Sequence, residues 1–132
     1  MKLIIHRGTH EIGGSCVEIR DNETGILIDI GLPLPHIGNN DFGARELEKC
    51  TGQELLKRKI LPDIPGIYTW DRRTPAIQAL LLSHAHLDHY GFIQYIKESV
   101  AVYCGEPGKK LINATIPFTP FSQYMLKKHH FH

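Results

Sequence analysis

The sequence has little of several features that commonly point to a function. It contains only three cysteines in 132 residues, and no two of them form a C-x-x-C pair. This excludes a disulfide scaffold, a zinc ribbon and a thioredoxin-type redox pair. No apolar run approaches the roughly 18 residues that a membrane span requires, and the first apolar run is too short for a signal peptide. We therefore expect a reduced, cytoplasmic setting and no membrane partner.

An excess of charge of one sign is also missing. The chain has 15 Lys plus Arg against 14 Asp plus Glu, so its formal net charge is +1. No overall field therefore draws it toward nucleic acid or an anionic membrane. Its 42% hydrophobic and 22% charged residues are ordinary for a globular protein, which excludes a disordered or collagen-like chain. The length of 132 residues predicts one domain with a real core.

What the chain does contain is a series of short apolar runs separated by turn signals. Runs at 3–5, 15–20 and 25–30, with a polar turn at 21–25, predict an antiparallel meander. Strands then alternate with helices after residue 78, so we expect an α/β (mixed α+β) fold. As a single domain, 1–132, which the resemblance described below implies is partial, the chain divides into a β-meander (1–35), a loop with a short helix (36–77), a βαβα unit (78–120) and a tail (121–132).

Three local patterns give sharper expectations. Thr51-x-x-Glu54 predicts a capping box that begins a helix. The fully apolar run at 79–82 is typical of a strand buried on both faces. Residues 91–96 have apolar side chains at helical spacing, which predicts a helix there.

The sharpest signal is a cluster of four metal-ligand side chains within six positions: His84, His86, Asp88 and His89. At a strand end, residues i and i+2 point to the same side, so His84 and His86 can share one metal ion. The chain then turns into a helix, which lets Asp88 and His89 face a second position. Imidazole and carboxylate ligands suit zinc, and iron and manganese stay open. Alone, each histidine could be a satisfied polar residue and Asp88 a helix N-cap, but capping does not require three histidines.

The segment 84–89 matches the H-x-H-x-D-H signature, and the chain thereby resembles the metallo-β-lactamase fold. Segments 11–16, 26–31 and 61–65 are similar in order and character to the ribonuclease J and β-CASP-like nuclease branch. The resemblance implies the N-terminal half of an αββα sandwich, a mixed sheet with helices on one face. It implies a hydrolase in which two zinc ions activate a hydroxide for attack on a phosphodiester of RNA or DNA.

The resemblance also assigns roles to single residues. His84 and His86 would bind the first ion, and Asp88 and His89 the second, with Asp88 also accepting or relaying a proton. Asp29 would be a buried carboxylate that orients a ligand histidine; the alternative is a turn residue that ends a strand.

Two glycines and the chain end complete these expectations. Gly13 and Gly14 would let the backbone turn near the metal cleft, or form an ordinary hairpin turn. The resemblance implies that the complete site of the family has more metal ligands than this motif provides. The histidines of the tail, residues 129, 130 and 132, are either a replacement ligand or part of a frayed terminus. A second chain or a missing C-terminal half would otherwise complete the site. Two alternatives therefore remain: a superfamily hydrolase acting on a thioester, lactone or small phosphodiester, and a truncated, non-catalytic metal-binding fragment.

Overall fold

The computed structural model describes residues 1–34, 49–118 and 131. Its strands are β1 (Lys2–Arg7), β2 (Cys16–Asp21), β3 (Thr24–Ile28), β4 (Ile77–Leu82) and β5 (Ala101–Cys104). Its helices are α2 (Gly52–Lys57), α3 (Leu87–Tyr90) and α4 (Glu106–Thr115), with 3₁₀ turns η1 (Ile93–Tyr95) and η2 (Ile116–Phe118). The expected α/β class is confirmed. Apart from residue 131, the expected tail lies outside the described residues.

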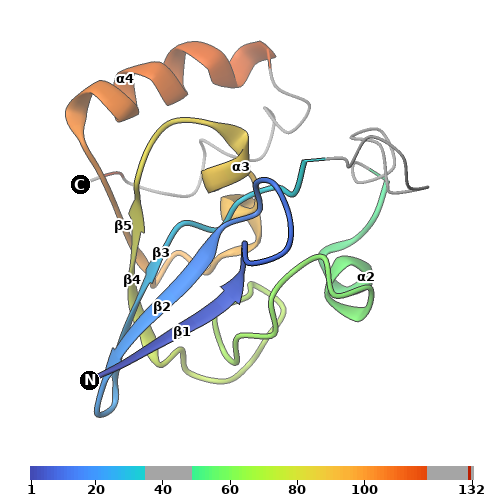
Figure 1. Ribbon diagram of the computed structural model, residues 1–132, viewed down its shortest axis with the longest axis vertical. Helices are drawn as coiled ribbons and strands as arrows, with labels where there is room; N and C mark the ends of the chain where they lie inside the picture. Colours follow the sequence, from blue (N-terminus) through green and yellow to red (C-terminus); the bar gives the residue numbers. More distant parts are fainter. Residues whose placement is uncertain (35–48, 119–130, 132) are drawn as a thin grey trace.

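The five strands form one mixed sheet in the order β1-β2-β3-β4-β5 (Figure 1). The pairs β1–β2 and β2–β3 are antiparallel, which is the predicted meander. The pairs β3–β4 and β4–β5 are parallel, so these three strands end at the same edge of the sheet. The metal motif lies at this edge, because His84 comes two residues after the last residue of β4.

Short-range signals in the sequence explain how two of these elements begin and turn. Asn22, in the turn between β2 and β3, has a φ of 51°, a conformation that asparagine adopts more readily than most residues. The Thr51 side chain accepts a hydrogen bond from the Glu54 backbone N–H, and the Glu54 carboxylate accepts one from the Thr51 N–H. The predicted capping box is therefore confirmed at the start of α2.

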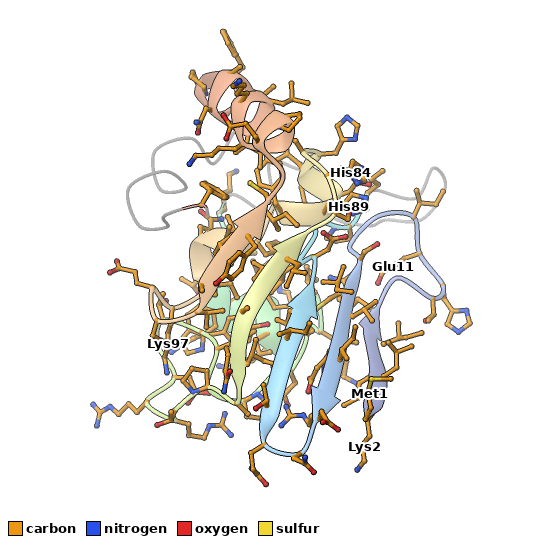
Figure 2. The ribbon with its side chains drawn as sticks, turned by 90° about the vertical axis from the view of Figure 1, so that its left-hand side faces the viewer. Met1, Lys2, Glu11, His84, His89 and Lys97 are labelled. Carbon is orange, nitrogen blue, oxygen red and sulfur yellow. The ribbon has the colours of Figure 1, made fainter. Side chains whose placement is uncertain are left out.

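One face of the sheet, here called the covered face, carries the core. Several of its strand residues are at most 2% exposed, among them Cys16, Glu18, Leu27, Leu80 and Val102. Buried side chains from α2, α3, η1 and α4 join the same cluster, among them Leu55, Tyr90, Ile93 and Ile112. In Figure 2 the strands lie in front, and α2 and α3 lie behind them. None of the helices among the described residues is long and apolar enough to cross a membrane.

The opposite side of the sheet, here called the open face, is also apolar. By the strand register it presents Leu3, Ile5, Val17, Ile19, Ile26, Ile28, Ala79, Leu81, Ala101 and Tyr103. None of these side chains is buried by the described residues, and Leu3 is 65% and Leu81 37% exposed. The expectation that residues 79–82 are buried on both faces is therefore wrong for this structure, since only one face has a covering layer among the described residues.

The helix expected at 91–96 is also absent from the structure. The helical segment ends at Tyr90, and only the 3₁₀ turn η1 follows. The cause is a contact from outside the segment: the Phe92 N–H donates to the Ile30 carbonyl, and the His89 carbonyl accepts from the Ile30 N–H. These groups would otherwise continue the helical ladder. The hydrogen bonds to Ile30 therefore take the place of those that the next turn of the helix would form.

Candidate metal centre

Three side chains of the motif meet beyond the end of β4. His84, Asp88 and His89 each offer a ligand atom, and these atoms all lie within 4.8 Å of one another. The rings of His84 and His89 are 3.7 Å apart between centroids, and both residues are labelled at the upper end of the sheet in Figure 2. His89 Nε2 lies 3.4 Å from Asp88 Oδ2. Two imidazoles and a carboxylate at this spacing fit a divalent metal ion.

His86 lies beside this group without joining it. Its ring is 4.9 Å from the His84 ring, centroid to centroid, and nearly perpendicular to it. His86 is the N-cap residue of α3, and its side chain makes no capping hydrogen bond. Asp88 is the second residue of α3, so the alternative in which Asp88 is the N-cap is wrong. The assignment of the four ligands to two separate ions stays a prediction.

Asp29 is the main support beneath the ligands. It follows β3 directly, is 4% exposed and has a φ of 62°. Its carboxylate accepts hydrogen bonds from the Ser83 backbone N–H at 2.8 Å and from His89 Nδ1 at 2.8 Å. A carboxylate can only accept, so the proton of His89 is on Nδ1 and the lone pair of Nε2 is available to a metal. This geometry is the one that an orienting carboxylate requires, and the backbone conformation also fits the strand-ending turn.

Ser83 extends the same support to His84. Its hydroxyl donates to Asp29 Oδ2 at 2.7 Å and lies 3.1 Å from His84 Nδ1. With its proton given to Asp29, the hydroxyl oxygen can accept from His84 Nδ1, which leaves Nε2 of His84 free as well. The sequence pattern did not indicate this role. The available signal was only its position, directly before His84 at the end of an apolar strand.

The α3 turn is held in place by the backbone that follows β3. The Ile30 N–H donates to the His89 carbonyl at 2.8 Å, and the Leu32 N–H donates to the Leu87 carbonyl at 2.9 Å. These bonds resemble a short strand pairing with the backbone of the motif. They hold the helix that carries Asp88 and His89 in position, although this helix has only four residues.

Gly31 is the point of closest approach in this docking. A Cβ atom at Gly31 would lie 1.6 Å from the Asp88 carbonyl oxygen and 2.3 Å from its carbonyl carbon. No heavy atom fits at these distances, and both clashes are with backbone rather than with a movable side chain. The importance of Gly31 was not predicted from the sequence, because nothing local indicates that a remote helix lies against it.

The Gly13–Gly14 pair lies on the other side of the same turn. Both residues have positive φ, 73° and 67°, which favours glycine. The Gly14 N–H donates to the carbonyls of Asp88 and Leu32, at 3.1 and 3.0 Å. A Cβ at Gly13 would lie 2.8 Å from Asp88 Cβ. The pair therefore does turn tightly beside the expected metal cleft.

Cys16 is 1% exposed, and burial raises the pKa of its thiol to about 12, an effect that Arg7 partly offsets. Such a thiol is not a thiolate ligand near neutral pH. The tail histidines, residues 129, 130 and 132, lie outside the described part of the chain.

Comparison with known proteins gives an independent view of the same region. The model of the "Metallo-beta-lactamase superfamily" matches residues 11–103. An "RNase J-like protein" of Methanocaldococcus jannaschii is 29% identical over 113 residues, which are 86% of this chain and 20% of the relative. "Ribonuclease J" of Pyrococcus abyssi is 27% identical over 70% of this chain and 19% of the relative. "Integrator complex subunit 11" of Danio rerio is 27% identical over 76% of this chain and 14% of the relative.

Comparison with solved structures supports the fold. A protein of unknown function from Enterococcus faecalis superposes with a TM-score of 0.64 at 24% identity. The match covers 88% of this chain and 28% of that protein. This chain thus spans about a fifth of the length of the first curated relatives that it matches.

Proposed function

The chain belongs to the metallo-beta-lactamase superfamily, and we propose that it carries part of the active site of a metal-dependent hydrolase of RNA or DNA phosphodiesters. The observation that carries this proposal is the convergence of His84, Asp88 and His89 within 4.8 Å over a buried Asp29. The proposal is supported by relatives that are named as ribonucleases over 70–86% of this chain.

In this proposal the four motif residues hold two ions. His84 and His86 bind one, and Asp88 and His89 bind the other, with zinc as the first choice and manganese or iron as alternatives. When bound, such ions lower the pKa of water and polarise a phosphoryl oxygen. Asp29 holds His89 through Nδ1, Ser83 holds His84, and Asp88 accepts or relays a proton. These residues set the orientation of the imidazoles before a metal arrives.

The site then needs ligands from elsewhere, since two protein ligands per ion are fewer than catalytic zinc sites use. We propose that residues 1–132 are one partial domain and that a second chain or a C-terminal half supplies the rest. The rival is a non-catalytic, metal-binding fragment, which is favoured by this ligand count and by the short span of the relatives that the chain covers.

Metal binding by the purified chain is the first test. We expect zinc, titrated calorimetrically, to bind the wild type and to bind His86→Ala and His89→Ala at least about tenfold more weakly, because each loses a ligand. His10→Ala is the matched control, since His10 is exposed in the loop between β1 and β2. Equal zinc affinity in all four proteins would contradict the proposed ligands.

Turnover separates the hydrolase from its rivals. The zinc-loaded chain is incubated with a labelled RNA oligonucleotide and, separately, with a chromogenic ester and a thioester. Cleavage of the oligonucleotide that is lost in His86→Ala supports the nuclease. Cleavage of only the ester or thioester supports another superfamily activity. Metal binding without any turnover, even when the second chain or C-terminal half that supplies the remaining ligands is present, supports the non-catalytic fragment.

A further inference from the structure

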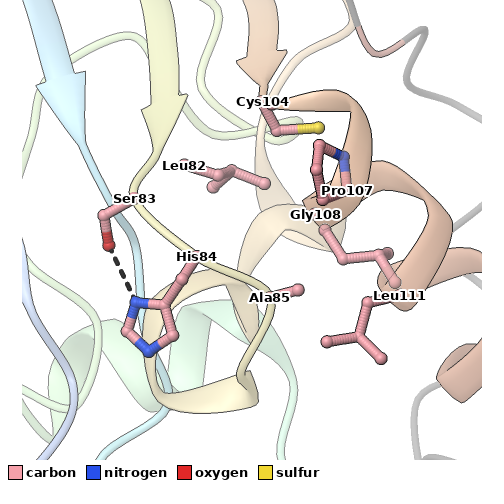
Figure 3. A pocket seen from close by; sticks show the side chains of 10 residues that line it. Leu82, Ser83, His84, Ala85, Cys104, Pro107, Gly108 and Leu111 are labelled. Carbon is pink, nitrogen blue, oxygen red and sulfur yellow. Dashed lines mark hydrogen bonds between the residues drawn. The ribbon is translucent and has the colours of Figure 1, made fainter.

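A cavity of about 370 Å³ lies between the end of β4 and the start of α4. Figure 3 shows Leu82 and Ala85 on one side of it and Pro107, Gly108 and Leu111 on the other, with Cys104 above. The full lining is Leu82, Ser83, His84, Ala85, Cys104, Gly105, Pro107, Gly108, Leu111 and Ile112. It is formed where two parallel strands end, a common place for ligand sites in α/β sheets.

The cavity adjoins the candidate metal centre. Ser83 and His84 line it, and the same two residues belong to the hydrogen-bonded support of the ligands. A molecule held at the metal centre by one group can therefore extend a neighbouring group past His84 into this space. The candidate metal centre and the cavity therefore share Ser83 and His84.

The chemistry of the lining favours a neutral, apolar group. Apart from His84, the described residues that line the cavity have no ionisable side chain other than the Cys104 thiol. Burial raises the pKa of this thiol, with a smaller opposing effect from Lys109, so the thiol is neutral at physiological pH. No side chain of α4 that lines the cavity carries a charge that could pair with a phosphate or carboxylate.

The size of the cavity restricts the ligand further. Pockets for small molecules measure roughly 300–1,000 Å³, so about 370 Å³ is at the lower end and suits one ring system. A nucleobase has this size, is neutral and presents apolar faces. In a nucleic acid, a base is also linked through its sugar to the phosphodiester that would lie at the metal centre.

We propose that this cavity binds the base of the nucleotide adjoining the scissile phosphodiester; this rests on the proposed function. The base lies between the Ala85 side and the Pro107–Leu111 side of the cavity, while its phosphate lies beyond His84. The chain thereby contributes a nucleotide-binding subsite as well as metal ligands.

Gly108 offers a clean way to fill the cavity. It lines the space, and a Cβ built on it meets no atom within 4 Å. Gly108→Phe therefore adds a ring at the lining of the cavity without a backbone clash. The matched control is Asn113→Phe, which adds the same ring at an exposed position of α4 outside the lining. Leu111→Glu, at a side chain that is 48% exposed, is a second variant that makes the wall polar.

The probes are adenosine 5′-monophosphate, ribose 5-phosphate, butyl phosphate and adenosine, each titrated into the zinc-loaded chain. We expect adenosine 5′-monophosphate to bind about tenfold more tightly than ribose 5-phosphate, as the burial of the apolar surface of one base implies. Gly108→Phe and Leu111→Glu should abolish this difference and leave ribose 5-phosphate unchanged. Asn113→Phe should preserve the difference.

Other outcomes overturn the inference or separate it from the proposed function. Equal affinity for adenosine 5′-monophosphate and ribose 5-phosphate in the wild type rejects the base subsite. An equal gain with butyl phosphate indicates an acyl-chain pocket instead. If no phosphate probe binds, the proposed function fails, and the inference is then decided by adenosine alone. NMR shifts of Gly105 and Leu111 with adenosine, absent in Gly108→Phe, would support the cavity as a base site; no shifts would reject it.

Discussion

The covered and open faces of the sheet consist of similar residues in different surroundings. On the covered face, Leu27, Leu80 and Val102 are at most 1% exposed. On the open face, their neighbours Leu81 and Tyr103 are 37% and 46% exposed. Apolar side chains of these strands point to both faces of the sheet. This pattern is typical of a sheet that is covered on both faces. Among the described residues, the segments 51–70, 87–100 and 106–112 cover the sheet on one face only.

The two faces of the sheet therefore have separate roles. The covered face and the strand ends support the metal centre through backbone docking. None of the open-face side chains belongs to the described ligand cluster, yet this face exposes a contiguous apolar surface of the kind that marks an interaction site. We expect the isolated chain to self-associate or to be marginally stable, which stays a prediction until association is measured.

The largest effect should come from Gly31→Ala. Its Cβ would lie 1.6 Å from the Asp88 carbonyl oxygen, so the segment after β3 and the α3 turn cannot both keep their places. We expect the free energy of unfolding to fall by about 4 kcal/mol, above the usual range for overpacking because backbone must move. Urea denaturation measures this loss, and zinc affinity should fall with it.

Gly108→Ala is the control for this substitution. It also exchanges a glycine for an alanine, but no atom lies within 4 Å of the new Cβ, and helix propensity favours alanine by up to about 1 kcal/mol. The variant should be as stable as the wild type or more stable. A similar loss in both variants would show that the close approach at Gly31 is unimportant.

These glycines also show how far the sequence could predict the structure. The turn at Asn22 and the capping box at Thr51 depend on residues within four positions, and both were predictable. The location of the motif was also predictable, because it directly follows an apolar run that predicts a strand. The docking of Ile30 on His89 was not predictable, since a backbone hydrogen bond between distant segments has no side-chain signature. The prediction of a helix at 91–96 was wrong for the same reason, because the hydrogen bonds of Ile30 to this segment could not be foreseen.

The residues of the candidate site also include some that the sequence predicts and one that it does not. Metal-ligand chemistry indicated His84, His86, Asp88 and His89 from their spacing alone. Ser83 carries no such chemistry until Asp29 is placed beneath it, 2.7 Å from its hydroxyl. A residue whose role depends on one remote partner can be identified only after the fold is known.

Leu80→Ala against Leu81→Ala compares the two faces directly. The residues are adjacent in β4 and differ in face, 0% against 37% exposed. Removing Leu80 should cost about 3 kcal/mol, within the range for buried leucines, whereas Leu81→Ala should cost less than about 1 kcal/mol. Thermal or urea unfolding at low protein concentration measures both. A large cost for Leu81→Ala would mean that the open face is covered in solution.

Lysines on the open face test whether that face mediates association. Sedimentation velocity of Leu3→Lys/Ile5→Lys should show at least about tenfold weaker self-association than the wild type, since each lost apolar contact contributes roughly 1.5 kcal/mol or more. Gln53→Lys/Ser99→Lys adds the same two charges away from the sheet and should associate as the wild type does. A wild-type chain that stays monomeric and melts sharply would contradict this expectation.

Glu18 is a buried carboxylate on the covered face that is 2% exposed. Burial acts to raise its pKa, but hydrogen bonds and charges from Arg20 and His6 together lower the pKa below its ordinary value of 4.5. A lowered folded-state pKa stabilises the protein above the unfolded-state value, and this contribution is lost as the pH falls through the folded-state value. Glu18→Gln should therefore cost about 1 kcal/mol near pH 7. The difference from the wild type in urea denaturation should shrink steadily below pH 4.5, and a difference independent of pH would show that packing at Glu18, rather than its charge, stabilises this face.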